Sequence, residues 1–309
     1  MSATIVARVV PLDALIPRVL DVRCEERDME TLTPWVFRHT NLAQEDCLDS
    51  WPDEDLTSSL LFDELFSYQS TIRARSSQQD ERGIERALRP SANITLPLKN
   101  WEVKDRYDHL AFTRSQGMIL RILMKTVYAS LDGVRKQDPE VRFAIYAPKR
   151  KFVIGGTQYS ARSEGEVTVG PRGRSIPIIS YTGWWIGQTW DEFLQETLGV
   201  MLGQLAQNIG VWKDDRLPQE EEVFVVGFHG YGIHIARGVF ARDAVTRVHS
   251  RGFSADERFE VEFTRSYNLC RKEEWNGAMR ALTRLFRYLL SGDAKVSGRL
   301  VHAEGRSPE

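Results

Sequence analysis

One stretch of this sequence limits the possible folds more than any other. Residues 176–187, IPIISYTGWWIG, begin as a continuous apolar run, which is typical of a strand buried on both faces of a sheet. A long helix is predicted directly after it, over 189–210, with Thr189 or Gln188 near its start and Gly210 at its end. A strand buried on both sides needs other layers against both faces, so the sequence predicts a layered fold.

The flanking segments indicate what these layers are. Apolar residues recur at helical spacing on both sides of the apolar strand, and β-branched or alternating stretches lie between them. Helices are predicted over 113–132 and 273–291, and strands over 141–147, 151–156, 164–170 and, as two strands around a glycine-rich turn, within 222–240. This order predicts an α/β fold with a mixed central sheet flanked by helices.

The charge is unevenly distributed along the chain. Residues 21–64 contain thirteen acidic and three basic residues, a net charge of −10, whereas the whole chain carries −2 and the remainder therefore +8. We expect an acidic N-terminal segment over 1–110, with short helices that are packed on the rest or partly disordered. An α/β domain follows over 111–292, and a flexible tail over 293–309. The acidic segment is either solvated surface or the counterpart of a body that meets phosphate.

Several classes of protein are excluded by what the sequence lacks. No run of about 18 apolar residues predicts a membrane span, and the first residues do not have the pattern of a secretory signal. The three cysteines, Cys24, Cys47 and Cys270, have the spacing of neither a disulfide framework nor a zinc site. We therefore expect a cytoplasmic protein with reduced thiols. Loops of the GxGxxG and GxxxxGK[ST] types and the HExxH and GxSxG motifs are also missing.

A family resemblance lies in the run from the apolar strand to the following strands. Its motif residues are Trp190-Asp191-Glu192 and Leu194 at the helix start, Leu198-Gly199-Val200 and Gln204 within the helix, and the strand Val225 to Tyr231, VVGFHGY. This pattern resembles the fungal branch of the PD-(D/E)XK nuclease-like superfamily. That branch has a strand ending in Glu-x-Lys, a W-E-E-A-L helix start, a glutamine-bearing helix and a G-H-D-W strand. The resemblance covers about residues 135–291 and implies a nuclease-like, restriction-endonuclease-like core.

The nuclease chemistry of that family needs residues that this sequence lacks at the matching positions. Arg142 stands where the first aspartate belongs, and Tyr181-Thr182-Gly183 where the Glu-x-Lys belongs. Mg²⁺ is held by oxygen ligands, so the resemblance implies a pseudo-nuclease without cofactor. An alternative stays open, in which Glu164 and Glu166 form a displaced metal pair with Lys149 or Lys151 nearby. On an exposed edge strand these two glutamates are ordinary surface residues.

The candidate site residues cluster around the end of the apolar strand. Ser180 and Tyr181 are candidate nucleophiles and His229 a candidate base, and the alternative is that they are ordinary strand residues. Trp184 either stacks on a substrate ring or packs on the following helix. Four carboxylates are candidates for holding a cationic substrate group: Glu164, Glu166, Glu192 and Glu196.

Two basic groups are candidates for contact with nucleic acid. One is the turn Lys149-Arg150-Lys151, and the other is the helical stripe of Arg280, Arg284 and Arg287. Each is either a phosphate contact or a solvated surface.

Three functions follow from these observations. The first is an enzyme acting on a tRNA-borne aminoacyl substrate, because the chain is similar in kind to fungal tRNA-dependent synthases of arginine-containing cyclodipeptides. The second is an inactive binding module for nucleic acid or protein, and the third a Mg²⁺-dependent nuclease with displaced acids. The sequence leaves the substrate and the oligomeric state open.

Overall fold

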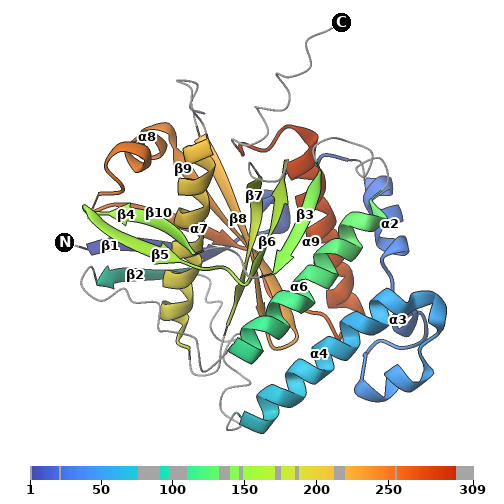
Figure 1. Ribbon diagram of the computed structural model, residues 1–309. Helices are drawn as coiled ribbons and strands as arrows, with labels where there is room; N and C mark the ends of the chain where they lie inside the picture. Colours follow the sequence, from blue (N-terminus) through green and yellow to red (C-terminus); the bar gives the residue numbers. More distant parts are fainter. Residues whose placement is uncertain are drawn as a thin grey trace, which may run out of the picture.

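The chain forms an α/β fold with a mixed central sheet flanked by helices, as the sequence predicted (Figure 1). The computed structural model describes residues 2–20, 22–75, 91–97, 110–131, 140–145, 149–170, 175–184, 188–211, 220–254 and 256–296. The last residues of the predicted tail, 297–309, lie outside this part.

Within the described residues, eight strands lie side by side in the central sheet, and a ninth, β11 (Tyr267–Asn268), pairs with β9. Two neighbouring pairs are parallel, β1 with β10 and β7 with β8, and the other pairs are antiparallel. The spatial order is β2 (Ser91–Pro97), β1 (Ser2–Val9), β10 (Arg258–Phe263), β9 (Gly232–Ala241), β8 (Glu220–His229), β7 (Ile176–Gly183), β6 (Gly165–Val169) and β3 (Val141–Ile145).

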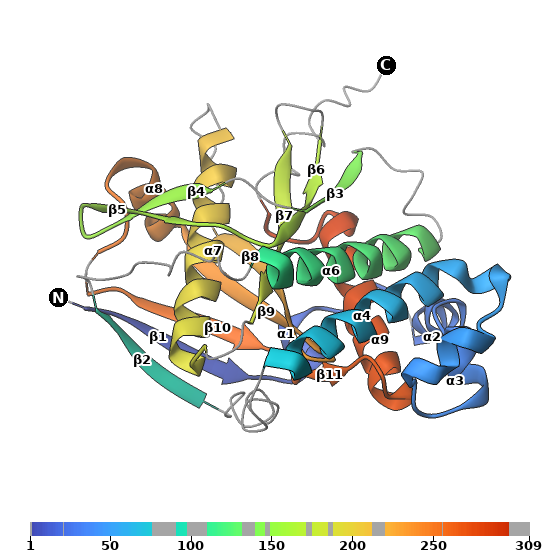
Figure 2. The same ribbon diagram turned by 60° about the horizontal axis from the view of Figure 1, so that its bottom comes forward.

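Long helices cover both faces of this sheet. Helix α7 (Trp190–Val211) crosses one face, and α4 (Leu56–Arg75), α6 (Leu110–Ser130) and α9 (Lys272–Ser291) gather at the other (Figure 2). The predicted helices over 113–132, 189–210 and 273–291 are confirmed within a few residues. A hairpin of β4 (Arg150–Ile154) and β5 (Thr157–Ala161) packs on α7. The shorter elements are α1 (Leu12–Leu15), α2 (Val22–Thr31), α3 (Trp35–His39), η1 (Glu45–Ser50), η2 (Asp53–Asp55) and α8 (Arg242–Ser250).

Each face of the sheet has its own hydrophobic core. Alternate residues of β8 point into the two different cores. Phe224 and Val226 belong to the core under α6 and α9, and Val223 and Val225 belong to the core under α7. This follows from the two-residue period of a strand. Strand β7 is buried at all eight positions, as expected for a strand covered on both faces.

Strand β7 contains a proline, which the interior of a sheet tolerates only at an irregularity. The register between β6 and β7 shifts between Val167 and Thr168, because Ile178 is an extra residue in β7 next to Pro177. The Pro177 carbonyl accepts hydrogen bonds from Gln204 Nε2 at 3.2 Å and Asn208 Nδ2 at 3.3 Å, both on α7. The bulge thus removes the need for an N–H group at the proline, and the hydrogen bonds to its carbonyl hold α7 on the sheet.

The N-terminal segment is more regular than the sequence indicated. Its first residues form β1, which pairs in parallel with β10 more than 250 positions away. Residues of α2, α3 and α4 enter the core shared with α6 and α9, among them Met29, Phe37 and Phe62. The first residues of the predicted tail are also held, because Glu222 N donates to Lys295 O at 2.8 Å.

Acidic residues of this segment pair with the predicted arginine stripe on α9. Arg284 Nε and Nη2 each donate to Glu25 at 3.0 Å, and Arg287 makes two bonds of 2.7 Å to Asp28. Arg284 is only 3% exposed, and it also contacts Asp13. Burial alone disfavours the Arg284 charge, but the hydrogen bonds to these carboxylates outweigh it and raise the pKa of Arg284 above its usual value.

These contacts change the interpretation of the stripe as a nucleic-acid surface. Arg284 and Arg287 already hold carboxylates of α2 and are not presented to solvent as phosphate ligands. Arg280 is exposed on the same helix. The uneven charge seen in the sequence is therefore partly neutralised inside the fold, where α2 meets α9.

Replacing Arg284 tests this pairing. Removing one partner of a buried ion pair leaves the other charge uncompensated, which costs about 3 kcal/mol or more. We expect Arg284→Met to lower the free energy of unfolding, measured by urea titration, by that amount. Arg280→Met, on the exposed face of the same helix, should change it by about 0.5 kcal/mol or less. Equal effects of the two substitutions would contradict the structural role of Arg284.

Candidate functional site

Polar side chains gather where the parallel strands β7 and β8 end. The pairing of these strands continues past Gly183, because Trp184 N donates to Phe228 O at 3.0 Å. His229 ends β8, and the N-terminus of α7 follows β7 after a short connection. In α/β sheets, ligands bind outside the carboxyl ends of parallel strands. This end of the sheet is therefore the candidate site, as the sequence analysis expected from the family pattern.

The two predicted nucleophiles lie on opposite faces of β7. Ser180 faces α7 and donates from Oγ to Gln204 Oε1 at 2.6 Å. Tyr181 belongs to the core on the α6 side, and burial, with the nearby Glu166 charge, raises the pKa of its hydroxyl well above the usual value. The structure therefore does not bring these two hydroxyls together, because successive side chains of a strand alternate.

His229 lies beside Trp184, with 5.3 Å between the ring centroids. Burial lowers the pKa of His229 to about 4, although hydrogen bonding to the Trp184 backbone acts in the opposite direction. The imidazole is therefore neutral at pH 7. Its Nδ1 has no hydrogen-bond partner in the part of the chain that the structure describes.

A second histidine lies in the same region. His234 of β9 pairs with Gly227 of β8, and Gly227 pairs on its other side with Thr182 of β7. A Cβ at Gly227 would overlap the His234 imidazole, so the ring lies over the glycine in the direction of Thr182. His234 Nε2 and Thr182 Oγ1 are both buried and lack hydrogen-bond partners within the described ranges. Burial, followed by the effect of His229, lowers the pKa of His234 to about 3.

Sequence reasoning missed Thr182 and His234 as members of the site. The available signal was Gly227, because a glycine inside an apolar strand marks a close approach of another group. Which group approaches depends on the register between strands, and single-strand patterns do not give that register.

Gln116 joins the site from α6. Its Nε2 donates to Tyr68 Oη at 2.7 Å and to the Trp184 carbonyl at 2.6 Å. Its Oε1 lies where a Cβ at Gly183 would be, and it has no partner among the described residues. Gly183 is therefore required for this close contact between α6 and β7.

Trp184 is part of a stack of aromatic rings at the start of α7. Its ring centroid lies 5.1 Å from that of Phe193, with 18° between the planes, and 6.1 Å from that of Trp190. Its Nε1 donates to Gln188 O at 3.1 Å. Of the two alternatives for Trp184, the structure shows the packing on the helix.

The four predicted carboxylates have different surroundings. Glu164 and Glu196 are buried near the site, and Glu196 accepts a bond of 2.8 Å from Gln188 Nε2. Glu166 is held by the Arg150 guanidinium, which also contacts Gln207 on α7.

Glu192 caps the N-terminus of α7. It accepts a hydrogen bond of 2.9 Å from Thr189 N, and Glu192 N donates to Thr189 Oγ1 at 3.2 Å. This reciprocal pair is a capping box, which gives Glu192 a structural role at the end of the helix.

The three residues of the predicted basic turn also differ in their surroundings. Lys149 and Lys151 are exposed, whereas Arg150 between them is buried against Glu166. Gly203 on α7 permits this approach, since a Cβ there would lie 3.0 Å from the Arg150 Cβ. Only the two lysines of this turn are presented to solvent.

The nuclease-like resemblance implies Mg²⁺, and the residues at this place do not fit that ion. The Glu166 carboxylate is bound to a guanidinium, and Ser180 beside it in the register donates to an amide. No group of three or more histidine, cysteine, aspartate or glutamate side chains suited to a metal occurs within the described residues. None of the three cysteines forms a disulfide.

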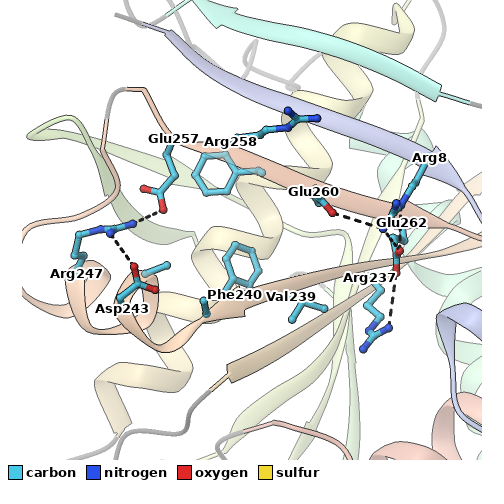
Figure 3. A pocket seen from close by; sticks show the side chains of 13 residues that line it. Arg8, Arg237, Val239, Phe240, Asp243, Arg247, Glu257, Arg258, Glu260 and Glu262 are labelled. Atoms are coloured by element: carbon cyan, nitrogen blue, oxygen red, sulfur yellow. Dashed lines mark hydrogen bonds and ion pairs between the residues drawn. The ribbon is translucent and has the colours of Figure 1, made fainter.

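A groove of about 470 Å³ lies elsewhere, between α8 and the outward side of β10 (Figure 3). Three of the arginines that line it contact acidic neighbours: Arg8 donates to Glu262 at 2.7 Å, Arg247 donates to Glu257 at 2.5 Å, and Arg237 lies 3.7 Å from Glu262. Figure 3 also shows Arg247 directed at Asp243. Because acids and guanidiniums alternate here, the groove has no excess of positive charge, and we do not assign it as the phosphate surface.

Neither a protein-family model nor a curated protein matches this sequence. Among the described helices, none has the length and apolar character needed to cross a membrane.

Replacing Glu192 tests its structural role. Loss of a capping box destabilises a helix by about 1 kcal/mol. We therefore expect Glu192→Ala to lower the free energy of unfolding by about that amount, measured by urea titration. Glu273→Ala, in the first turn of α9, is the control and should have a smaller effect. Unchanged stability with weakened substrate binding would instead support the substrate role predicted from the sequence.

The two buried histidines predict acid sensitivity. Their pKa values in the folded protein lie below the usual 6.5, so the unfolded chain takes up protons first when the pH falls. Their contribution to stability is complete above about pH 6.5, and it is lost as the pH falls towards 4 for His229 and 3 for His234. The slope reaches about 1.4 kcal/mol per pH unit for each histidine.

Urea unfolding of wild type and variants between about pH 7.5 and pH 4.5 measures this slope. His234→Phe, which suits the neighbouring Phe193 and Phe263 rings, should make it shallower. The control is His39→Gln, at an exposed position of α3, and it should leave the slope unchanged. The same slope in His234→Phe as in wild type would contradict the buried, neutral state of His234.

Proposed function

We propose that this chain is an enzyme on a restriction-endonuclease-like core that has lost nuclease chemistry, and that it transfers an aminoacyl group from tRNA, as in cyclodipeptide formation. The order β7, α7, β8, with the two strands parallel, supports the core. It is the order in which the fungal PD-(D/E)XK branch has its Glu-x-Lys strand, its glutamine-bearing helix and its G-H-D-W strand.

One observation carries the proposal. Buried polar atoms with no hydrogen-bond partner among the described residues lie around the ends of β7 and β8. Thr182 Oγ1, His229 Nδ1 and His234 Nε2 are on the side of α7, and Gln116 Oε1 is on the side of α6. Leaving such an atom unpaired costs about 1–3 kcal/mol. A group of them in a folded protein calls for a functional explanation, and a bound polar substrate supplies one.

The surroundings favour acyl transfer over phosphate hydrolysis. His229 is neutral at pH 7, so it can accept a hydrogen bond or a proton from an attacking amine. In the reaction the amine nitrogen bonds to the ester carbonyl carbon, the ester C–O bond breaks, and the amine proton is passed on to the departing ribose hydroxyl. Ser180 and Tyr181 take no part, because each is fixed in the packing of β7.

Two carboxylates suit a cationic side chain on the substrate. Glu164 and Glu196 are buried near the same end of the sheet, and a pair of carboxylates binds a guanidinium with good geometry. Glu166 and Glu192 are left out of this role, because the Arg150 guanidinium neutralises Glu166 and Glu192 caps the N-terminus of α7.

Contact with tRNA is supported by charge. The chain outside residues 21–64 carries a net charge of +8, and Lys149 and Lys151 are exposed. We propose that these lysines and Arg280 contact phosphates, and that the protein works in the cytoplasm, where its thiols stay reduced.

Expression in a bacterial host tests the proposal. Mass spectrometry of the medium should detect a cyclic dipeptide that is absent from cells with an empty vector. His229→Asn should lower its amount by about 100-fold or more, whereas His39→Gln should leave it unchanged. Absence of any such product would contradict the proposal. Mg²⁺-dependent cleavage of DNA or RNA by the purified protein would favour the nuclease alternative, and binding without either reaction the binding module.

A further inference from the structure

A row of three residues crosses β7, β8 and β9 on the side that faces α7. The strand register aligns Thr182 with Gly227, and Gly227 with His234. Neighbouring residues in such a row have Cβ atoms about 5 Å apart. Because Gly227 has no side chain, the space above β8 is taken by the His234 imidazole, and its Nε2 end lies over the glycine.

Both side chains that flank this glycine in the row carry an unsatisfied polar atom. Thr182 is 1% exposed and His234 2% exposed, so bulk water does not reach them. Within the described part of the chain neither Thr182 Oγ1 nor His234 Nε2 has a hydrogen-bond partner. Ser180 lies two residues before Thr182 on the same face of β7. Unlike the Thr182 hydroxyl, the Ser180 hydroxyl has a hydrogen-bond partner, Gln204 on α7.

The surroundings of His234 are aromatic. The His234 ring lies 5.4 Å from Phe193 in an edge-to-face arrangement and 5.7 Å from Phe263. An apolar wall strongly disfavours a charged group and strengthens each hydrogen bond formed within it. The imidazole is neutral for the same reason.

We propose that Thr182 and His234 together bind an uncharged polar group of the substrate, an ester or amide carbonyl with its neighbouring N–H, and that Gly227 allows the His234 imidazole to lie over β8 on the side of Thr182. This inference rests on the proposed function and specifies a subsite of the same site. The hydroxyl donates to the carbonyl oxygen, and the imidazole nitrogen accepts from the N–H. The two residues bind and position the substrate, and no proton transfer is assigned to them.

Thr182→Val tests whether the hydroxyl is kept for a ligand. Valine has nearly the same shape and lacks the hydroxyl. If that hydroxyl is unpaired in the free protein, its removal leaves the urea midpoint unchanged or raises it. The matched control is Thr283→Val on α9, another buried threonine, whose Oγ1 donates to Arg280 O at 3.0 Å. Thr283→Val should lower the midpoint, because it breaks an existing hydrogen bond.

Binding of 2,5-piperazinedione supplies the second measurement. This probe is the smallest cyclic dipeptide and carries two uncharged amides. Ligand-observed NMR should detect its binding to the wild-type protein and to Thr283→Val. For Thr182→Val the dissociation constant should rise about fivefold or more, as expected when one hydrogen bond is lost.

Three results would overturn the subsite. They are a loss of stability in Thr182→Val as large as in Thr283→Val, equal binding of the probe by Thr182→Val and wild type, and no binding by wild type. A loss of stability would mean that the hydroxyl bonds to the protein or to a fixed water. Failure of the proposed function is distinguishable, because it is the absence of product in the bacterial host, whereas the urea and probe measurements use the purified protein alone.

Discussion

The burial of strand β7 on both faces is the constraint on which the rest of the structure depends. No water reaches its backbone or side chains, so each polar group must find a partner on a neighbouring element. The Pro177 carbonyl accepts hydrogen bonds from side-chain amides of α7, and the Ser180 hydroxyl donates to Gln204 on the same helix. The Trp184 carbonyl, just beyond the strand, accepts from Gln116 of α6. These bonds fix both helices relative to the sheet. The hydroxyls of Tyr181 and Thr182 are exceptions, since neither has a partner among the described residues. Thr182 lies in one row with His234, whose Nε2 is also unpaired, and for this reason we interpret that neighbourhood as a site.

The arrangement of charge at this site differs from that of a metal-dependent enzyme. The Glu166 carboxylate, which a metal-dependent enzyme would use, is bound by Arg150. The acidic helix α2 lies elsewhere, against Arg284 and Arg287 of α9. The two histidines at the end of β8 and in β9 are uncharged because they are buried. Uncharged histidines beside the buried carboxylates Glu164 and Glu196 suit the proposed transfer of an acyl group better than the cleavage of a charged phosphate backbone, which relies on cationic stabilisation.

Local patterns were sufficient for the elements that have strong periodicity. The apolar run of β7, the helix that follows it and the pair of strands around the Gly230 turn were all predictable, because burial on two faces and a helical stripe leave a signal in single segments. Strand β1 was not, since its position depends on a parallel pairing with β10 at the far end of the chain. The site shows the same limit. His229 was found from its place in the pattern, whereas Thr182 and His234 meet only through the register of three strands across Gly227.

The central claim is that substrate binds at the carboxyl ends of β7 and β8 without a metal ion. NMR of the ring nitrogens of Trp184, His229 and His234 during titration with puromycin, a stable analogue of an aminoacyl-adenosine end, tests it most directly. The account predicts that these resonances shift with puromycin and do not respond to Mg²⁺. A response to Mg²⁺, or shifts confined to the groove between α8 and β10, would contradict it.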